Sequence, residues 1–127
     1  MIVGIGIDIV SVERIHTVID RNGDTFLAKV FGAAEIGYCQ TRKDPIPFFA
    51  ARWAAKEAFY KALPSFLQPM SNWRSIEVTS SGNAAPAVQI VSEELKSGLN
   101  AVGNYKIYLS MSHEKLFATA QVVIEVV

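Results

Sequence analysis

Hydrophobic and polar residues alternate at both ends of the chain with the period of two that β-strands show. Within residues 2–10, one strand face carries Val3, Ile5, Ile7 and Ile9, and the other carries Gly4, Gly6, Asp8 and Val10. Residues 105–112 and 117–127 alternate in the same way around the turn HEKL. The pattern predicts a buried N-terminal strand and a C-terminal antiparallel hairpin with one buried face.

The middle of the chain follows the helical period, with capping and breaking residues at the expected ends. The predicted helices cover residues 11–23, 24–32, 33–40, 48–63 and 92–101. Two short strands are predicted over residues 74–79 and 87–91, joined by the turn SSGNAAP. The predicted fold class is α+β, with one long helix packed on a mainly antiparallel sheet, in a single domain over residues 1–127.

The composition argues against two classes of protein, those that bind nucleic acid and those that span a membrane. Half of the 127 residues are hydrophobic, and twelve basic residues balance twelve acidic ones. A neutral chain lacks the net positive field that attracts nucleic acid, and no stretch reaches the roughly 18 apolar residues of a membrane span. The single cysteine, Cys39, fits a reducing compartment. We therefore expect a cytoplasmic protein without nucleic-acid or membrane partners.

Asp8 is the one charged residue in the apolar N-terminal strand. A buried carboxylate without a partner is strongly unfavourable, so Asp8 needs a cation or several hydrogen-bond donors. Its neighbours on the same face, Gly4 and Gly6, leave room for a ligand or for another backbone. The alternatives left open are a capping residue for the next helix and a residue at the solvated end of the strand.

Glu57 and Lys61 lie one turn apart on the longest predicted helix, within WAAKEAFYKAL. Alanines flank them, whereas the large aromatic residues fall on the opposite side at about 100° per residue. Small residues around a carboxylate leave space for a bulky group, and such a pair suits a metal and phosphate site. The alternative is an ordinary solvent-exposed Glu–Lys pair, which contributes roughly 0.3–0.5 kcal/mol.

Three further residues are candidates for ligand binding. Arg52 and Lys56 fall near the apolar side of the long helix, where they either extend to solvent or reach a ligand at a subunit boundary. His113 ends the polar run SMSH at the hairpin turn. The alternative for His113 is a plain turn histidine, because the spacing required for a zinc site or a Cys–His pair is missing.

The sequence resembles the bacterial holo-acyl-carrier-protein synthases, the small 4′-phosphopantetheinyl transferases, in the segments MIVGIGIDIVSVERI, FFAARWAAKEAFYKAL, WRSIEV and LSMSHEKLFATAQVVIE. These segments cover both ends and the central helix, in the order and at the spacing usual in the family. The resemblance implies the 4′-phosphopantetheinyl transferase fold. It also implies transfer of the phosphopantetheine arm of coenzyme A to a serine of an apo acyl carrier protein, with release of 3′,5′-ADP.

The resemblance assigns roles to individual residues. The family's metal-binding aspartate and glutamate fall on Asp8 and Glu57, with Mg²⁺ as the implied cofactor, and Glu57 and Lys61 are the implied catalytic residues. The positions that contact coenzyme A are Lys43, Arg52, Lys61 and His113. Arg14 and Arg21 match basic positions that meet the acidic carrier protein. The family assembles as a homotrimer with active sites between subunits.

General chemistry supports the same assignment. Attack on a pyrophosphate spreads negative charge over its oxygens, so catalysis is mainly positioning and charge neutralisation. Mg²⁺ takes one or two protein carboxylates, and phosphates and waters complete its octahedron. Asp8 and Glu57 supply two carboxylates from separate elements, and Lys61 adds a positive charge one turn away. The base that accepts the serine proton is either Glu57 or a metal-bound water.

Two alternatives to a pantetheinyl transferase remain open. The segment after the long helix is PSFLQPM, where the family usually has glycines, and Ser75 stands where it often has aspartate. The altered segment motivates a non-catalytic paralogue that binds coenzyme A or a carrier protein without turnover. A metal nuclease would also combine a strand acid with a glutamate and a lysine, but the zero net charge argues against it.

Overall fold

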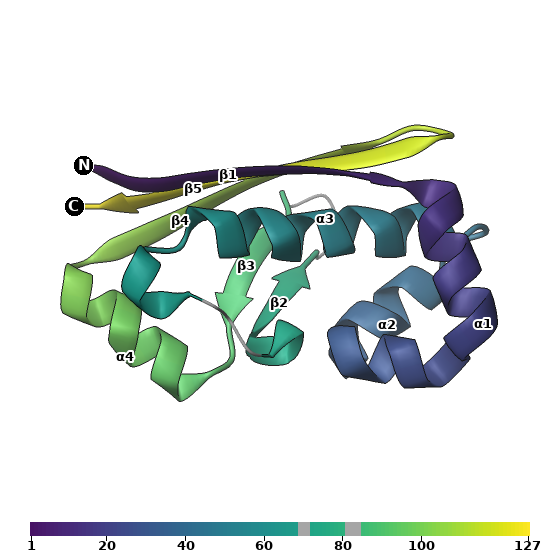
Figure 1. Cartoon of the computed structure of the whole chain (residues 1–127), viewed down its shortest axis with the longest axis horizontal. Helices are drawn as coiled ribbons and strands as arrows, with labels where there is room; N and C mark the ends of the chain where they lie inside the picture. Colours follow the sequence, from purple (N-terminus) through teal and green to yellow (C-terminus); the bar gives the residue numbers. More distant parts are fainter. Residues whose placement is uncertain (69–71, 81–84) are drawn as a thin grey trace.

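The computed structural model has an α+β fold and describes residues 1–68, 72–80 and 85–127, so parts of PSFLQPM and of the predicted turn SSGNAAP lie outside it (Figure 1). In chain order the elements are β1 (Ile2–Ser11), α1 (Val12–Val30), α2 (Ala33–Gln40), α3 (Ile46–Ala62), the 3₁₀ turns η1 (Ser65–Leu67) and η2 (Trp73–Ser75), β2 (Ile76–Thr79), β3 (Ala87–Ile90), α4 (Glu93–Val102), β4 (Tyr105–His113) and β5 (Phe117–Val126). The predicted fold class is confirmed.

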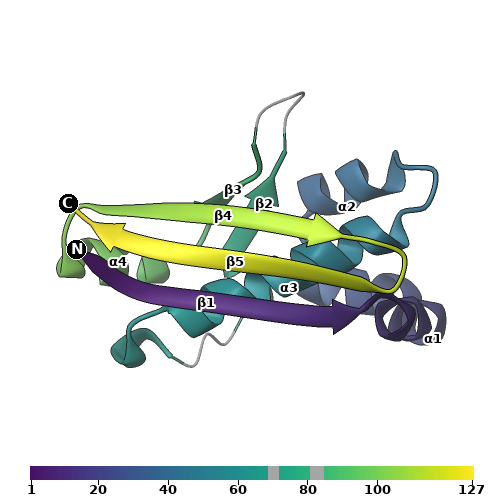
Figure 2. The ribbon, with the colours of Figure 1, turned by 90° about the horizontal axis from the view of Figure 1, so that it is seen from above.

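The two ends of the chain meet in one antiparallel sheet of three strands, ordered β1–β5–β4. Figure 2 shows these strands side by side, with both termini at the same end of the sheet. Met1 and Val126 close that end through two backbone hydrogen bonds of 2.7 and 2.8 Å. Because the inner faces of β1 and β5 are both buried, the apolar alternation specifies their register, in which Asp8 pairs with Ala120.

Helix α3 lies along the inner face of this sheet (Figure 1). Its contact with β1 is backbone to backbone. A Cβ on Gly6 would lie 1.8 Å from the carbonyl oxygen of Ala58. A Cβ on Gly4 would lie 1.7 Å from the carbonyl oxygen of Ala62. The room that the sequence predicts beside Asp8 is therefore occupied by another backbone.

The alanines of α3 are part of this contact. Ala50, Ala54 and Ala58 have no exposed surface, and Ala120 on the inner face of β5 is also buried. Small residues on both surfaces allow the helix and the sheet to approach closely. The alanines are therefore explained by the contact with the sheet, whereas Glu57 itself stays half-buried.

A second layer lies on the opposite side of α3 from the three-stranded sheet (Figure 1). It contains the two-stranded antiparallel sheet β2–β3 together with α1, α2 and α4. Phe31 at the end of α1 packs on Phe49 of α3, with 5.1 Å between the ring centroids. Because α3 is covered on both sides, Arg52 and Lys56 are only 2% and 0% exposed. Of the two alternatives for these side chains, extension to solvent is wrong.

Local signals explain most of the element boundaries. Ser11 caps α1, because its hydroxyl accepts a hydrogen bond of 3.2 Å from the Arg14 amide. Gly23, with a φ of 51°, kinks α1 where the sequence predicts the end of one helix and the start of the next. The strand predicted from residue 74 begins at Ile76, because Asn72 caps a 3₁₀ turn that precedes it.

The outer face of the three-stranded sheet is uncovered, since the helices lie on its inner side (Figure 2). On this face Ile5, Ile7 and Ile9 are 60%, 61% and 65% exposed. The prediction of a buried N-terminal strand is right for the face that carries Gly6 and Val10, and wrong for the isoleucine face. Alternation separates two faces of a strand but does not specify what covers each one. Across the described residues, no helix combines the length and the apolar character of a membrane span.

The glycine contact can be tested with Gly6→Ala. The added methyl group would collide with the Ala58 carbonyl group, which is backbone and cannot rotate away. We expect the free energy of unfolding to fall by about 3 kcal/mol, measured by urea denaturation with circular dichroism. Gly37→Ala is the matched control, because Gly37 is exposed within α2 and nothing surrounds its Cβ position. This control should gain about 0.5–1 kcal/mol, and equal midpoints for the two variants would contradict the proposed contact.

Candidate active site

Asp8 lies on the inner face of β1, where its side chain is 16% exposed. The Lys61 ammonium donates to the carbonyl oxygen of Ile7 at 3.0 Å and to Oδ1 of Asp8 at 3.3 Å. Thr119 of β5 donates its hydroxyl hydrogen to the carbonyl oxygen of Asp8 at 2.8 Å, which holds this point of the strand. The cation that a strand aspartate requires is therefore supplied by α3.

Glu57 lies one helical turn before Lys61 and is half-buried. The pKa of its carboxyl group is raised, first because burial disfavours the charged form and second because the Asp8 carboxylate repels it. The positive charges of Lys61 and Arg14 act in the opposite direction on the same pKa. The structure thus brings two carboxylates and two cations into one electrostatic cluster, with contributions from β1, α1 and α3.

The carboxylate oxygens of Asp8 and Glu57 form a donor set that fits Mg²⁺. Burial is the main cause of the raised pKa of Glu57 and the Asp8 carboxylate the second, and a cation between the two carboxylates would relieve their repulsion. Mg²⁺ commonly takes one or two protein carboxylates and fills its other positions with waters or phosphates. Within the described part of the chain, no group of three or more acidic, histidine or cysteine side chains is placed to hold a metal. A bound Mg²⁺ would therefore need ligands from water or substrate.

A cavity of about 200 Å³ lies beside the N-terminal half of α3. Two of the residues singled out in the sequence, Arg52 and His113, line it. The lining is completed by Tyr38, Phe48, Ala51, Ser80, Pro86 and Met111. The His113 ring, at the end of β4, packs edge-on against Phe48 with 5.0 Å between the centroids. The fold thus brings a guanidinium and an imidazole from distant parts of the sequence to one cavity with aromatic walls.

Arg52 is oriented by neighbours in the wall of this cavity. Its Nη2 donates to the Ser80 hydroxyl at 2.9 Å, and its Nη1 donates to the carbonyl oxygen of Phe48 at 3.3 Å. The guanidinium carbon lies 4.3 Å from the centroid of the Tyr38 ring, which is a cation–π contact. Among the described residues, no atom accepts a hydrogen bond from its buried Nε. A guanidinium that is held in the wall of a cavity suits an anionic ligand.

The kinked helix α1 places Arg14 and Arg21 along one shallow groove, about two turns apart. The other residues of the groove are Ser11, Glu13, Thr17 and Val18. Val18 lies between the two arginines and adds an apolar contact. Because Arg14 also lowers the pKa of Glu57, one end of this groove lies within electrostatic reach of the carboxylate pair.

Lys43 lies on the exposed loop between α2 and α3 and is not among the residues that line the cavity. Its neighbour Arg42 contacts the cavity wall instead. Nη2 of Arg42 donates to the Tyr38 hydroxyl at 2.6 Å, and the guanidinium carbon lies 4.5 Å from the centroid of the Tyr38 ring. Sequence reasoning missed Tyr38 and Arg42, because Arg42 follows the end of α2 and the helical period gives no signal for this pair.

The segment PSFLQPM closes the end of α3 without a glycine. Pro64 follows the helix, and the Gln68 side-chain amide donates to the carbonyl oxygens of Tyr60 and Leu63 at 3.1 and 2.9 Å. Carbonyl groups at a helix C-terminus otherwise have no intrahelical partner. Gln68 therefore stabilises the last turn of α3, which carries Lys61.

The chain matches known proteins along nearly its whole length. The family model described as the 4′-phosphopantetheinyl transferase superfamily matches residues 4–119. The holo-[acyl-carrier-protein] synthase of Thermodesulfovibrio yellowstonii is 43% identical over 124 residues, which cover 98% of this chain and 99% of that protein.

Solved structures agree with the fold. The holo-(acyl-carrier-protein) synthase of Bacillus anthracis in complex with CoA (3′,5′-ADP) is 32% identical, with a TM-score of 0.79, and the match covers 100% of this chain and 99% of that chain. The holo-[acyl-carrier-protein] synthase of Neisseria meningitidis is 30% identical, with a TM-score of 0.83 and coverage of 98% and 99%. The predicted fold is confirmed by these matches. The chain therefore belongs to the 4′-phosphopantetheinyl transferase superfamily.

Proposed function

We propose that this protein acts in the cytoplasm, where it transfers the 4′-phosphopantetheine arm of coenzyme A to a serine of an apo acyl carrier protein and releases 3′,5′-ADP. The observation that carries the proposal is the cluster of Asp8, Glu57 and Lys61, with Arg52 of the cavity wall on the same helix as the last two. A holo-[acyl-carrier-protein] synthase is related over the full length, and a structural neighbour holds CoA (3′,5′-ADP).

In the proposed reaction the serine oxygen attacks the β-phosphorus of coenzyme A, and the bond from this phosphorus to the bridging oxygen breaks. The bridging oxygen leaves with 3′,5′-ADP. Lys61 supplies positive charge while negative charge builds on the pyrophosphate oxygens. Glu57 is proposed to accept the serine proton, because it is a carboxylate one helical turn from Lys61 in this cluster.

The proposed cofactor is Mg²⁺, held by Asp8 and Glu57. When bound, the ion would neutralise charge on the pyrophosphate and orient it. The residues proposed to contact coenzyme A are Lys43, Arg52, Lys61 and His113. Arg52 has the strongest support, because it lines the cavity and its guanidinium is held there by Ser80, Phe48 and Tyr38.

The proposed docking surface for the carrier protein is the α1 groove that contains Arg14 and Arg21. Two arginines on one helix face complement an acidic partner locally, although the chain as a whole is neutral. Because Arg14 also acts on the Glu57 carboxyl group, a partner docked in this groove would have its serine close to the proposed base.

We propose a homotrimer that buries the outer face of the three-stranded sheet. In the register of the sheet, Ile5 pairs with Val123, and Val123 pairs with Tyr108, so one row crosses all three strands. Ile7 and Ile9 extend the exposed apolar surface along β1. An exposed apolar strip of this kind is typical of a protein–protein interface, and a closed ring of three copies would cover it in each subunit.

A second candidate function is the binding of coenzyme A or a carrier protein without turnover. It is favoured by the segment PSFLQPM, where Gln68 occupies the helix end in place of the glycines usual in the family. Turnover separates the two functions, because only a transferase adds the phosphopantetheine arm to the carrier protein.

Glu57→Gln tests the catalytic proposal. The substitution removes the charge and the basicity of this side chain but keeps its shape, so we expect turnover to fall at least about a hundredfold. The assay is incubation with coenzyme A, Mg²⁺ and several apo carrier proteins, followed by intact mass spectrometry of the carriers. Glu94→Gln, at an exposed position of α4, is the matched control and should keep full activity. If the wild type binds coenzyme A but modifies none of the carriers, the binding function is favoured instead.

The same substitution should change how stability depends on pH. Because the folded-state pKa of Glu57 is raised above its ordinary 4.5, the folded protein binds more protons than the unfolded chain between these two values. The wild type therefore loses stability as pH rises through this interval. In metal-free buffer, Glu57→Gln should be more stable than the wild type at neutral pH, and the difference should shrink below pH 4.5. Urea denaturation at several pH values measures the difference, and one that is constant with pH would exclude a raised pKa.

Ile7→Lys tests the proposed trimer. A lysine in the middle of β1 on the outer face would have to bury its charge in the interface, so we expect monomers in analytical ultracentrifugation. Val91→Lys is the matched control, because Val91 is 50% exposed but follows β3 in the other sheet. A wild type that sediments as a monomer, or an Ile7→Lys protein that remains a trimer, would rule out this interface.

A further inference from the structure

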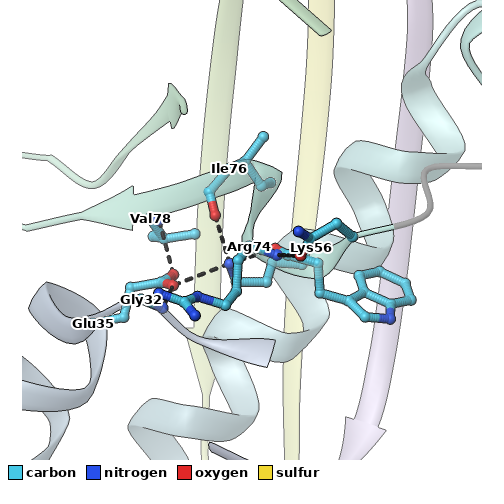
Figure 3. A network of polar contacts seen from close by, with 8 residues as sticks. Gly32, Glu35, Lys56, Arg74, Ile76 and Val78 are labelled. Carbon is cyan, nitrogen blue, oxygen red and sulfur yellow. Dashed lines mark hydrogen bonds and ion pairs between the residues drawn. The ribbon is translucent and has the colours of Figure 1, made fainter. Parts of the chain in front are cut away.

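Two charged side chains are fully buried on the side of α3 away from the proposed catalytic cluster. Lys56 and Glu35 are 0% and 1% exposed, and their charged groups lie 3.0 Å apart (Figure 3). The Lys56 ammonium also donates to the carbonyl oxygens of Trp73 and Ile76, at 2.8 and 2.6 Å. Its three hydrogens therefore have three acceptors, one on α2 and two on the segment that leads into β2.

Glu35 extends the same network to two backbone amides. The amide of Gly32 donates to Oε1 at 2.9 Å, and the amide of Val78 donates to Oε2 at 2.9 Å (Figure 3). The pair thus joins the N-terminus of α2, the middle of α3 and both η2 and β2. Every one of these bonds is made by a charged group, and such bonds are stronger and more directional than neutral ones.

Stability alone does not account for this pair. A buried ion pair loses the hydration of two charges, and well-packed apolar residues commonly stabilise a fold as much or more. What the pair adds is position, because its four backbone partners are held at defined distances. Arg74 is near enough for its charge to act on Lys56, but it lies at the exposed rim and not within the network.

The network leads directly to the cavity. The amide of Val78 is anchored to Glu35, and two residues later Ser80 accepts a hydrogen bond of 2.9 Å from Nη2 of Arg52. Arg52 in turn lies one helical turn before Lys56 on α3. One end of this path is the buried pair and the other end is the guanidinium in the cavity wall.

We propose that Lys56 and Glu35 are positioning residues for coenzyme A binding. They set β2 on α3 so that Ser80 orients the Arg52 guanidinium toward the cavity. This inference rests on the proposed function, in which Arg52 contacts coenzyme A. Lys56 itself does not touch the substrate, although it directly precedes Glu57 in the sequence.

The test is the double variant Lys56→Met/Glu35→Gln, which removes both charges together and leaves neither one buried alone. We expect its dissociation constant for coenzyme A, measured by calorimetry, to rise about tenfold. The KM for coenzyme A should rise with it, whereas the KM for the carrier protein should stay within about twofold. Lys96→Met is the matched control, because it removes an exposed pair with Glu93 and should leave both constants unchanged.

A purely structural role predicts a different result. It would lower the folded fraction, and with it kcat, while the folded molecules kept their affinity for coenzyme A. That outcome would overturn the proposal. Ser80→Ala provides a second test should the double variant fail to fold, because it interrupts the path at a partly exposed residue and leaves the buried pair intact. It should also weaken coenzyme A binding, and an unchanged dissociation constant would overturn the proposal.

A thermodynamic cycle with Arg52→Met tests whether the buried pair affects coenzyme A binding through Arg52. If the pair acts through Arg52, adding Lys56→Met/Glu35→Gln to Arg52→Met should weaken coenzyme A binding no further. Fully additive losses would show another route and overturn the inference. If Arg52→Met weakens binding and the double variant does not, only the inference fails. If Arg52→Met alone has no effect, the proposed coenzyme A pocket fails and the inference fails with it.

Discussion

The backbone contact between β1 and α3 is the constraint on which the proposed catalytic cluster depends. At Gly4 and Gly6 the strand lies so close to the helix that a single methyl group would overlap a carbonyl oxygen. Glycine is the only residue that permits this approach. Asp8 follows these glycines on the same strand face, and Glu57 precedes Ala58 on the helix. A wider separation of the two elements would move the two carboxylates apart.

The proximity of the Asp8 and Glu57 carboxylates is electrostatically unfavourable, and the rest of the fold maintains it. The raised pKa of Glu57 reflects burial and the charge of Asp8, with Lys61 and Arg14 as the opposing cations. Packing holds the cluster in place: the alanine face of α3 is buried on the sheet, and Phe49 of α3 is buried against Phe31 in the second layer. Two carboxylates held together in this way are a suitable site for a divalent cation, which would relieve the repulsion that the fold imposes.

The proposed site has a catalytic end and a cavity end, and different interactions hold each of them in place. The catalytic end depends on close backbone packing between β1 and α3. The cavity end depends on charged hydrogen bonds, in which Lys56 and Glu35 tie β2 to two helices. Because α3 carries Arg52, Glu57 and Lys61, this one helix relates the two ends of the site to each other. The outer face of the sheet is then free to serve as an interface without disturbing either end.

The sequence by itself determined the local structure and the chemistry of the single residues. Alternation at both ends predicts the strands, and Ser11 and Gly23 mark the cap and the kink of α1, because capping and periodicity depend on near neighbours. The family resemblance directed attention to Asp8 and Glu57. Only the tertiary structure decided which surfaces meet: the isoleucine face of β1 remained exposed, and Lys56 was buried with Glu35 instead of reaching solvent. A hydrophobic period separates the faces of an element, but what covers each face depends on contacts between residues far apart in the chain, and no local pattern encodes those contacts.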